Sequence, residues 1–114
     1  MRNFLLIAGS VLLLGSCAPG ALYNWGNYQT ATYSYVKKGG TDKDAATLVS
    51  TYQYIINKPG GIRGVVPPGI YADYGYLLFT QGKTEEALNY MKMEIGLYPE
   101  SAVFVGRIIK QIEK

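Results

Sequence analysis

The chain has 114 residues and a net charge of +3, and 48% of its residues are hydrophobic. This length suffices for one small domain, and so small a charge, with no basic block longer than Lys37-Lys38, argues against nucleic-acid binding. The sequence contains no histidine, which excludes histidine as a general base or a metal ligand.

The N-terminus combines a short basic region with an uncharged apolar run. Arg2 precedes residues 4–14, a run shorter than the about 20 residues that a membrane-spanning helix needs. The run ends in Leu14-Gly15-Ser16-Cys17, an aliphatic and two small residues before a cysteine. This pattern resembles the lipobox of bacterial lipoproteins, although Ala, Ser or Thr is more usual at the position of Gly15.

We therefore predict that residues 1–16 are a signal peptide that is removed, and that Cys17 carries the lipid anchor. Cys17 is the only cysteine, so no intramolecular disulfide can form, and two acyl chains already give stable anchoring. The resemblance also implies that Ala18, in place of aspartate, favours the outer membrane, facing the periplasm. The alternative is that Cys17 is a buried thiol and residues 1–16 are a core helix.

After a lipidated tether at residues 17–24, residues 25–58 are predicted to be a diverged helical hairpin. Aromatic spacing predicts a first helix at residues 22–38, ended by Gly39-Gly40, although residues 31–35 would equally suit a strand. Residues 42–57 are predicted to be an amphipathic helix with Thr41 as its N-cap. Its apolar face comprises Ala45, Leu48, Val49, Tyr52, Ile55 and Ile56.

A linker rich in glycine and proline at residues 59–67 leads to three further helices. The first spans residues 68–80, and Thr84 is predicted to cap the second, which ends at Tyr98-Pro99. A last helix at residues 101–114 carries an apolar stripe with a spacing of four. This stripe comprises Phe104, Ile108 and Ile112.

Residues 68–101 resemble a tetratricopeptide repeat, a helical hairpin of about 34 residues. The matching positions are Tyr71, Tyr74, Gly75, Leu78, Ala87, Met91 and Pro99. Closely packed helices need small residues where they cross, which Gly75 and Ala87 provide. Glu94 departs from the pattern, because a small residue is expected there. The predicted fold is all-α, a short array of antiparallel, tetratricopeptide-like hairpins in which residues 68–114 form a hairpin plus a C-terminal helix.

Three segments resemble DUF4810, a family of small lipoproteins of unknown function. They are Tyr23-Asn24-Trp25-Gly26-Asn27-Tyr28, then Pro67-Pro68-Gly69 with Gly75-Tyr76-Leu77-Leu78, and finally Tyr98-Pro99-Glu100-Ser101-Ala102-Val103-Phe104. The resemblance spans nearly all of residues 17–105. It implies an envelope lipoprotein commonly encoded beside lipoproteins similar to the curli secretion channel subunit, and it carries over no catalytic or binding residue.

The predicted function is that of a non-enzymatic adaptor for another envelope protein. Aromatic side chains near the anchor are the candidate partner contacts, since Tyr and Trp are favoured at interfaces. They are Tyr23, Trp25, Tyr28, Tyr33 and Tyr35. Trp25 and Tyr28 could instead be core residues, and the same alternative holds for Tyr33 and Tyr35. The alternative function is peptidoglycan or glycan binding, with tyrosines stacking on sugar rings.

No catalytic residue, metal site, cofactor, nucleic acid or small-molecule substrate is predicted. Most of the eight carboxylates lie at helix starts or on polar faces. Asp73 is the exception, because it lies next to the inward-facing Tyr74, where neither capping nor solvation accounts for a carboxylate. The alternative is that Asp73 simply faces solvent on its turn of the helix.

Overall fold

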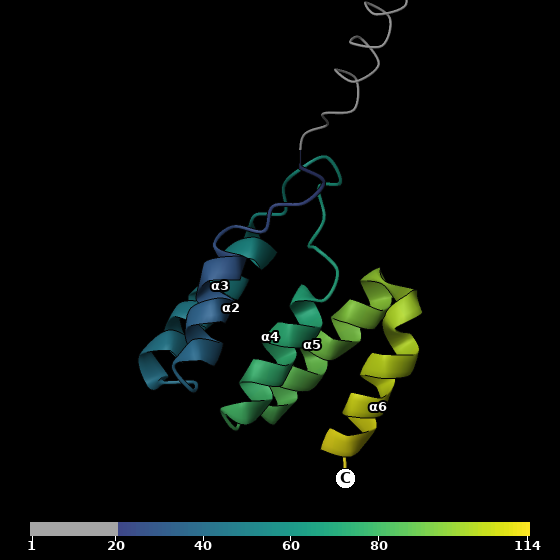
Figure 1. Cartoon of the computed structure of the whole chain (residues 1–114). Coiled ribbons are helices and arrows are strands. Elements are labelled where there is room, and N and C mark those ends of the chain that lie inside the picture. The colour runs from purple at the N-terminus through teal and green to yellow at the C-terminus, as the bar shows by residue number, and fades with distance from the viewer. Residues whose placement is uncertain (1–20) are drawn as a thin grey trace, which may run out of the picture.

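The computed structural model describes residues 21–114, which form the predicted all-α fold (Figure 1). The helices are α2 (Tyr28–Lys37), α3 (Asp42–Asn57), α4 (Ile70–Thr80), α5 (Thr84–Leu97) and α6 (Ala102–Ile112), with a 3₁₀ turn at Pro99–Ser101. No residue from 21 to 114 is in a β-strand, so the strand alternative for residues 31–35 is wrong. The predicted signal peptide and Cys17 lie outside the described residues.

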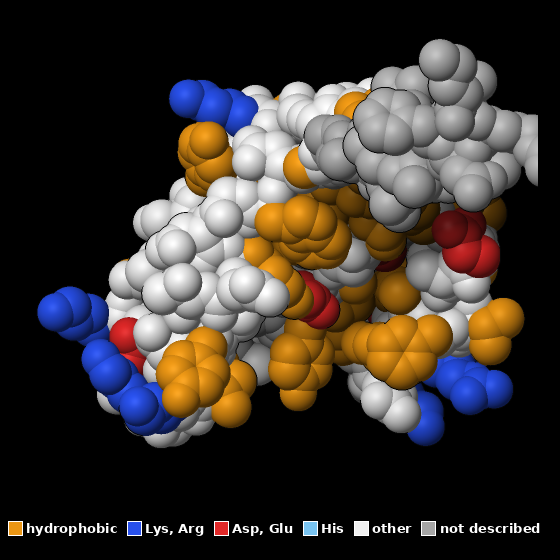
Figure 2. All heavy atoms as spheres, turned by 45° about the horizontal axis from the view of Figure 1, so that its top comes forward, with side chains coloured by type: hydrophobic (Ala, Val, Ile, Leu, Met, Phe, Trp, Pro, Cys, Tyr) orange, Lys and Arg blue, Asp and Glu red, His pale blue; other side chains and the backbone are white. Residues whose placement is uncertain are grey.

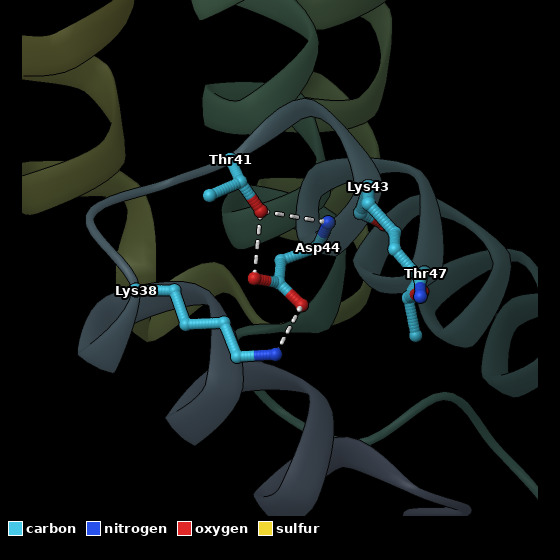
Figure 3. A network of polar contacts seen from close by, with 5 residues as sticks. All are labelled: Lys38, Thr41, Lys43, Asp44 and Thr47. Atoms are coloured by element: carbon cyan, nitrogen blue, oxygen red, sulfur yellow. Dashed lines mark hydrogen bonds and ion pairs between the residues drawn. The ribbon is translucent and has the colours of Figure 1, made fainter.

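Helix α3 begins with the side-chain cap that the sequence predicts (Figure 3). The Thr41 hydroxyl accepts a hydrogen bond from the Asp44 amide (3.3 Å) and donates one to the Asp44 carboxylate (2.7 Å). The Lys38 ammonium lies 4.0 Å from the other carboxylate oxygen of the buried Asp44, but the lysine side chain is exposed, and a single pair at this distance adds little stability. The helix start is therefore fixed mainly by Thr41, which supplies an acceptor to an otherwise unpaired amide.

Helix α2 is shorter than predicted, because residues 21–24 pair with residues 58–63 instead of winding into the helix. The Leu22 carbonyl accepts a hydrogen bond from the Arg63 amide (2.9 Å), and the Asn24 side chain donates one to the Lys58 carbonyl (3.1 Å). Gly26 has a positive φ of 53°, a conformation that a helix does not contain. The start of α2 is thus set by contacts with residues more than thirty positions away.

The prediction that Thr84 caps α5 is wrong. Lys83 is the N-cap residue, it makes no side-chain capping bond, and Thr84 is already the first helical residue. The preceding turn uses Gly82 at a φ of 83°, and the Lys83 amide donates to the Leu78 carbonyl (2.9 Å). The chain therefore enters α5 one residue earlier than the capping pattern indicates.

Helices α4 and α5 cross at the two small residues that the sequence indicates. Gly75 is buried, and a Cβ atom added there would lie 2.8 Å from the Ala87 carbonyl oxygen and 3.0 Å from Met91 Cγ. Ala87 itself is fully buried. Only a residue without a side chain fits at position 75 at this separation of the two helices.

Glu94 performs a task that its sequence position does not indicate. Its side chain is only 2% exposed, and its carboxylate accepts hydrogen bonds from the Gly69 amide (3.1 Å) and the Ala72 amide (3.2 Å). Gly69 is the N-cap residue of α4 and has no side chain to cap the helix, and Ala72 lies in its first turn. A carboxylate from α5 thus replaces the local cap, at the end of the helix where negative charge is favoured.

The core continues from the α2–α3 hairpin through α4 to α5, and α6 packs on α5 through a second cluster. The second cluster is Met91 with Val105 and Ile109. Phe104, the first residue of the apolar stripe predicted for the last helix, is 70% exposed and so does not face the core. Val105 and Ile109 form the buried face in its place.

Aromatic rings form a continuous series from the segment before α2 across four helices. Their centroid distances lie between 4.7 and 6.2 Å, and in order the rings are Tyr23, Trp25, Tyr28, Tyr52, Tyr74, Tyr90 and Tyr71. Tilted and edge-on arrangements of this kind stabilise beyond simple burial. Many of the tyrosines therefore serve packing between helices.

Candidate functional site

The candidate site is an apolar groove between the α2–α3 hairpin and the helices that follow it. It has a volume of about 430 Å³. Helix α2 contributes Tyr28 and Tyr35, α4 contributes Asp73 and Tyr76, and α6 contributes Phe104. Figure 2 shows hydrophobic side chains gathered around the hollow with an acidic group among them. Concave apolar surfaces with few polar groups are the usual form of binding sites.

Asp73 is the only charged residue that lines the groove. The Tyr28 hydroxyl donates a hydrogen bond to its carboxylate (3.1 Å). Burial among the aromatic side chains raises the pKa of Asp73, and the hydrogen bond from Tyr28 opposes that shift only in part. Burial and the neighbouring negative charge likewise raise the pKa of the Tyr28 hydroxyl.

Asp73 as a whole is an exposed residue, so the side chains around it shield its carboxylate only in part, and Tyr28 is its one side-chain donor among the described residues. An anion in such a setting is stabilised by a cation placed beside it. The groove therefore combines an apolar lining with one position that suits a Lys or Arg from a binding partner.

The five aromatic residues predicted from the sequence divide between the groove and its surroundings. Tyr28 and Tyr35 line the groove. Trp25 is 39% exposed and its ring lies 5.3 Å from that of Tyr28, while Tyr23 packs edge-on against Trp25. Tyr33 does not reach the groove; it is 65% exposed, and the Lys37 ammonium lies 5.6 Å from its ring centroid.

Sequence reasoning missed the contribution of the later helices to this site. Tyr76 and Phe104 are exposed aromatic residues that line the groove from α4 and α6. The only signal in the sequence for the contribution of α6 is its wide apolar surface. The pair Phe104 and Ile108 and the pair Val105 and Ile109 each form an apolar stripe, and one buried face needs only one of them. Asp73 carried a signal, namely a carboxylate that neither capping nor solvation explained.

The described part of the chain contains no group of three or more carboxylate, cysteine or histidine side chains placed to hold a metal ion. Between residues 21 and 114 no helix is long and apolar enough to cross a membrane.

Fold and groove together define a small protein of helical hairpins with an apolar groove on its surface. The chain belongs to the family described as domain of unknown function (DUF4810), whose model matches residues 22–108. This confirms the family resemblance seen in the sequence. Comparison with curated proteins and with solved structures finds no match.

Proposed function

We propose that this protein is a lipid-anchored adaptor of the outer membrane that faces the periplasm and binds another envelope protein in its groove. The observation that carries the proposal is the groove itself, in which exposed aromatic residues surround one carboxylate. The family resemblance implies a partner among lipoproteins similar to the curli secretion channel subunit. Lipidation of Cys17 would hold the adaptor beside such a partner.

The arrangement of the helices supports a relationship to tetratricopeptide repeats. Two antiparallel hairpins, α2–α3 and α4–α5, are followed by the single helix α6 (Figure 1). The first helix of each pair and α6 supply most of the groove lining. In repeat arrays of this kind, the concave surface formed by equivalent helices is the usual binding face.

A protein segment suits the groove better than a sugar. Sugar binding by stacking needs several free aromatic faces, whereas the rings of Tyr28 and Tyr52 in the groove pack on one another, which leaves Tyr76 and Phe104 as its exposed aromatic side chains. An apolar segment would cover Tyr76 and Phe104, and a Lys or Arg on that segment would pair with Asp73. Charge-assisted hydrogen bonds of this kind give orientation as well as affinity.

Site-specific photo-crosslinking in intact cells tests the groove. A benzophenone amino acid at Phe104 or Tyr76 is expected to give one discrete adduct with an envelope protein, identified by mass spectrometry. The matched control is Asn89, an exposed residue of α5, a helix that contributes nothing to the groove lining. It should give no such adduct.

Adding Asp73→Asn should lower the yield of the adduct roughly tenfold. A hydrogen bond to a charged group contributes at least about 1.5 kcal/mol, which is about a factor of ten, and the lower end applies because Asp73 is exposed. Equal labelling from Asn89 and Phe104, or an adduct yield that Asp73→Asn leaves unchanged, would show that the partner is not bound in the groove.

The anchor is tested by Cys17→Ser. This variant is expected to remain uncleaved by the lipoprotein signal peptidase and to incorporate no labelled palmitate, because only the thiol can accept the diacylglycerol group. Palmitate incorporation is measured alongside that of the unchanged chain. A mutant labelled as strongly as the wild type would rule out Cys17 as the anchor.

A further inference from the structure

One end of the molecule is formed by residues 21–25 and 58–65, here called the tip. The Ala21 carbonyl accepts a hydrogen bond from the Ile62 amide (3.0 Å), next to the Leu22–Arg63 and Asn24–Lys58 bonds described above. Gly61, at a φ of 72°, approaches so closely that a Cβ atom there would lie 2.6 Å from the Leu22 carbonyl oxygen. These contacts hold the two segments together as one surface.

The tip is both apolar and basic. Ile62 is 65% exposed, and Leu22 and Trp25 are also exposed hydrophobic residues. The charged side chains of the two segments are Lys58 and Arg63, both exposed, and neither segment contains Asp or Glu. Exposed apolar residues bordered by cations suit the interface of a bilayer that contains anionic lipids. Tryptophan favours the same interfacial zone.

The position of the tip along the chain supplies the second argument. Ala21 belongs to the tip and follows Cys17 by four residues. A fully extended chain spans at most about 3.3–3.6 Å per residue, so the separation cannot exceed about 14 Å. A lipid on Cys17 would therefore keep the tip close to the phospholipid headgroups, with little freedom to turn away.

We propose that the tip rests on the anionic phospholipid surface, with Ile62 and Leu22 entering the headgroup layer and Lys58 and Arg63 beside lipid phosphates. This inference rests on the proposed lipid anchor. The turn between α2 and α3 and the C-terminus lie at the opposite end of the molecule (Figure 1). The helices then project from the membrane, and the groove opens sideways toward partners held at the same surface.

Trp25 is the only tryptophan and belongs to the tip, so its fluorescence reports on contact with the membrane. The purified lipidated chain is incorporated into vesicles of phosphatidylethanolamine and phosphatidylglycerol. We expect quenching by phospholipids brominated high on the acyl chain and weak quenching by aqueous acrylamide. Lys58→Gln with Arg63→Gln, and separately Ile62→Ser, should reduce the lipid quenching several-fold and restore acrylamide access. Circular dichroism should show unchanged helix content.

The matched control is Lys37→Gln with Lys83→Gln, which removes the same charge at the opposite end of the molecule and should leave quenching unchanged. The inference is overturned if acrylamide still quenches Trp25 of the wild-type lipidated chain and brominated lipid does not. Equal behaviour of the tip and control variants would do the same.

Failure of the anchor is recognised separately, because mass spectrometry shows whether the purified chain carries lipid. If it does not, co-sedimentation with the same vesicles decides the inference. The tip is supported as a membrane contact if the wild type and the control variant bind the vesicles and the tip variants do not. No binding, or equal binding by both variants, overturns it.

Discussion

Replacing Glu94 with alanine is expected to lower the free energy of unfolding by about 2–4 kcal/mol, because two amides at the start of α4 lose their acceptor inside the protein. The carboxylate is buried and bonded to the Gly69 and Ala72 amides, and the N-cap residue Gly69 has no side chain that could replace it. Chemical denaturation followed by circular dichroism measures the loss. Amide hydrogen exchange should accelerate at Gly69 and Ala72 in particular.

Two further variants make the Glu94 test specific. Glu94→Gln retains one oxygen acceptor and should lie between the wild type and the alanine variant. Glu85→Ala removes an exposed carboxylate from the first turn of α5, the helix that carries Glu94. It should lower the free energy of unfolding by at most about 1 kcal/mol. If Glu94→Ala unfolds at the same denaturant concentration as Glu85→Ala, the start of α4 does not depend on this carboxylate.

Gly75→Ala is expected to destabilise the protein by about 1–3 kcal/mol, because the added methyl group overpacks the crossing of α4 and α5. The nearest obstacle is the Ala87 carbonyl oxygen at 2.8 Å, a backbone atom that moves only if the whole helix shifts. Elsewhere in a helix the same substitution is favourable by about 0.5–1 kcal/mol. The direction of the change is therefore diagnostic.

Gly106→Ala provides the matched control, because a Cβ atom at this position of α6 would have no neighbour within 4 Å. It should raise the midpoint of thermal unfolding while Gly75→Ala lowers it. If both substitutions stabilise the protein, the two helices do not cross closely at Gly75.

The connector carries more structure than its composition indicates. Val66 is buried, and its carbonyl accepts a hydrogen bond from the Tyr98 hydroxyl (2.6 Å). Burial, followed by the neighbouring Tyr23 side chain, raises the pKa of Tyr98 to about 12. Tyr98 thus joins the end of α5 to the connector. A stretch rich in glycine and proline is fixed here by side chains from elsewhere in the chain.

Local signals in the sequence determined the all-α class and much of the helix pattern. Residues 42–57 form a helix with the predicted bounds, because Thr41 supplies a local cap, the apolar spacing is helical, and glycine and proline follow. The small residues Gly75 and Ala87 likewise identified the crossing of α4 and α5. The residues of the family segments were sufficient to indicate DUF4810, which the match over residues 22–108 confirms.

Only the tertiary structure decided where long-range contacts override these local signals. The start of α2, the capping of α4 by Glu94 and the outward position of Phe104 each depend on residues distant in sequence. The groove has the same origin, since Tyr28, Asp73 and Phe104 come from three helices. Helical periodicity shows which residues share a face of a helix. The apolar face of α6 is so wide, however, that the helix could pack on its neighbour in more than one rotation about its own axis. Contact with α5 buries Val105 and Ile109, and that choice leaves Phe104 beside the groove.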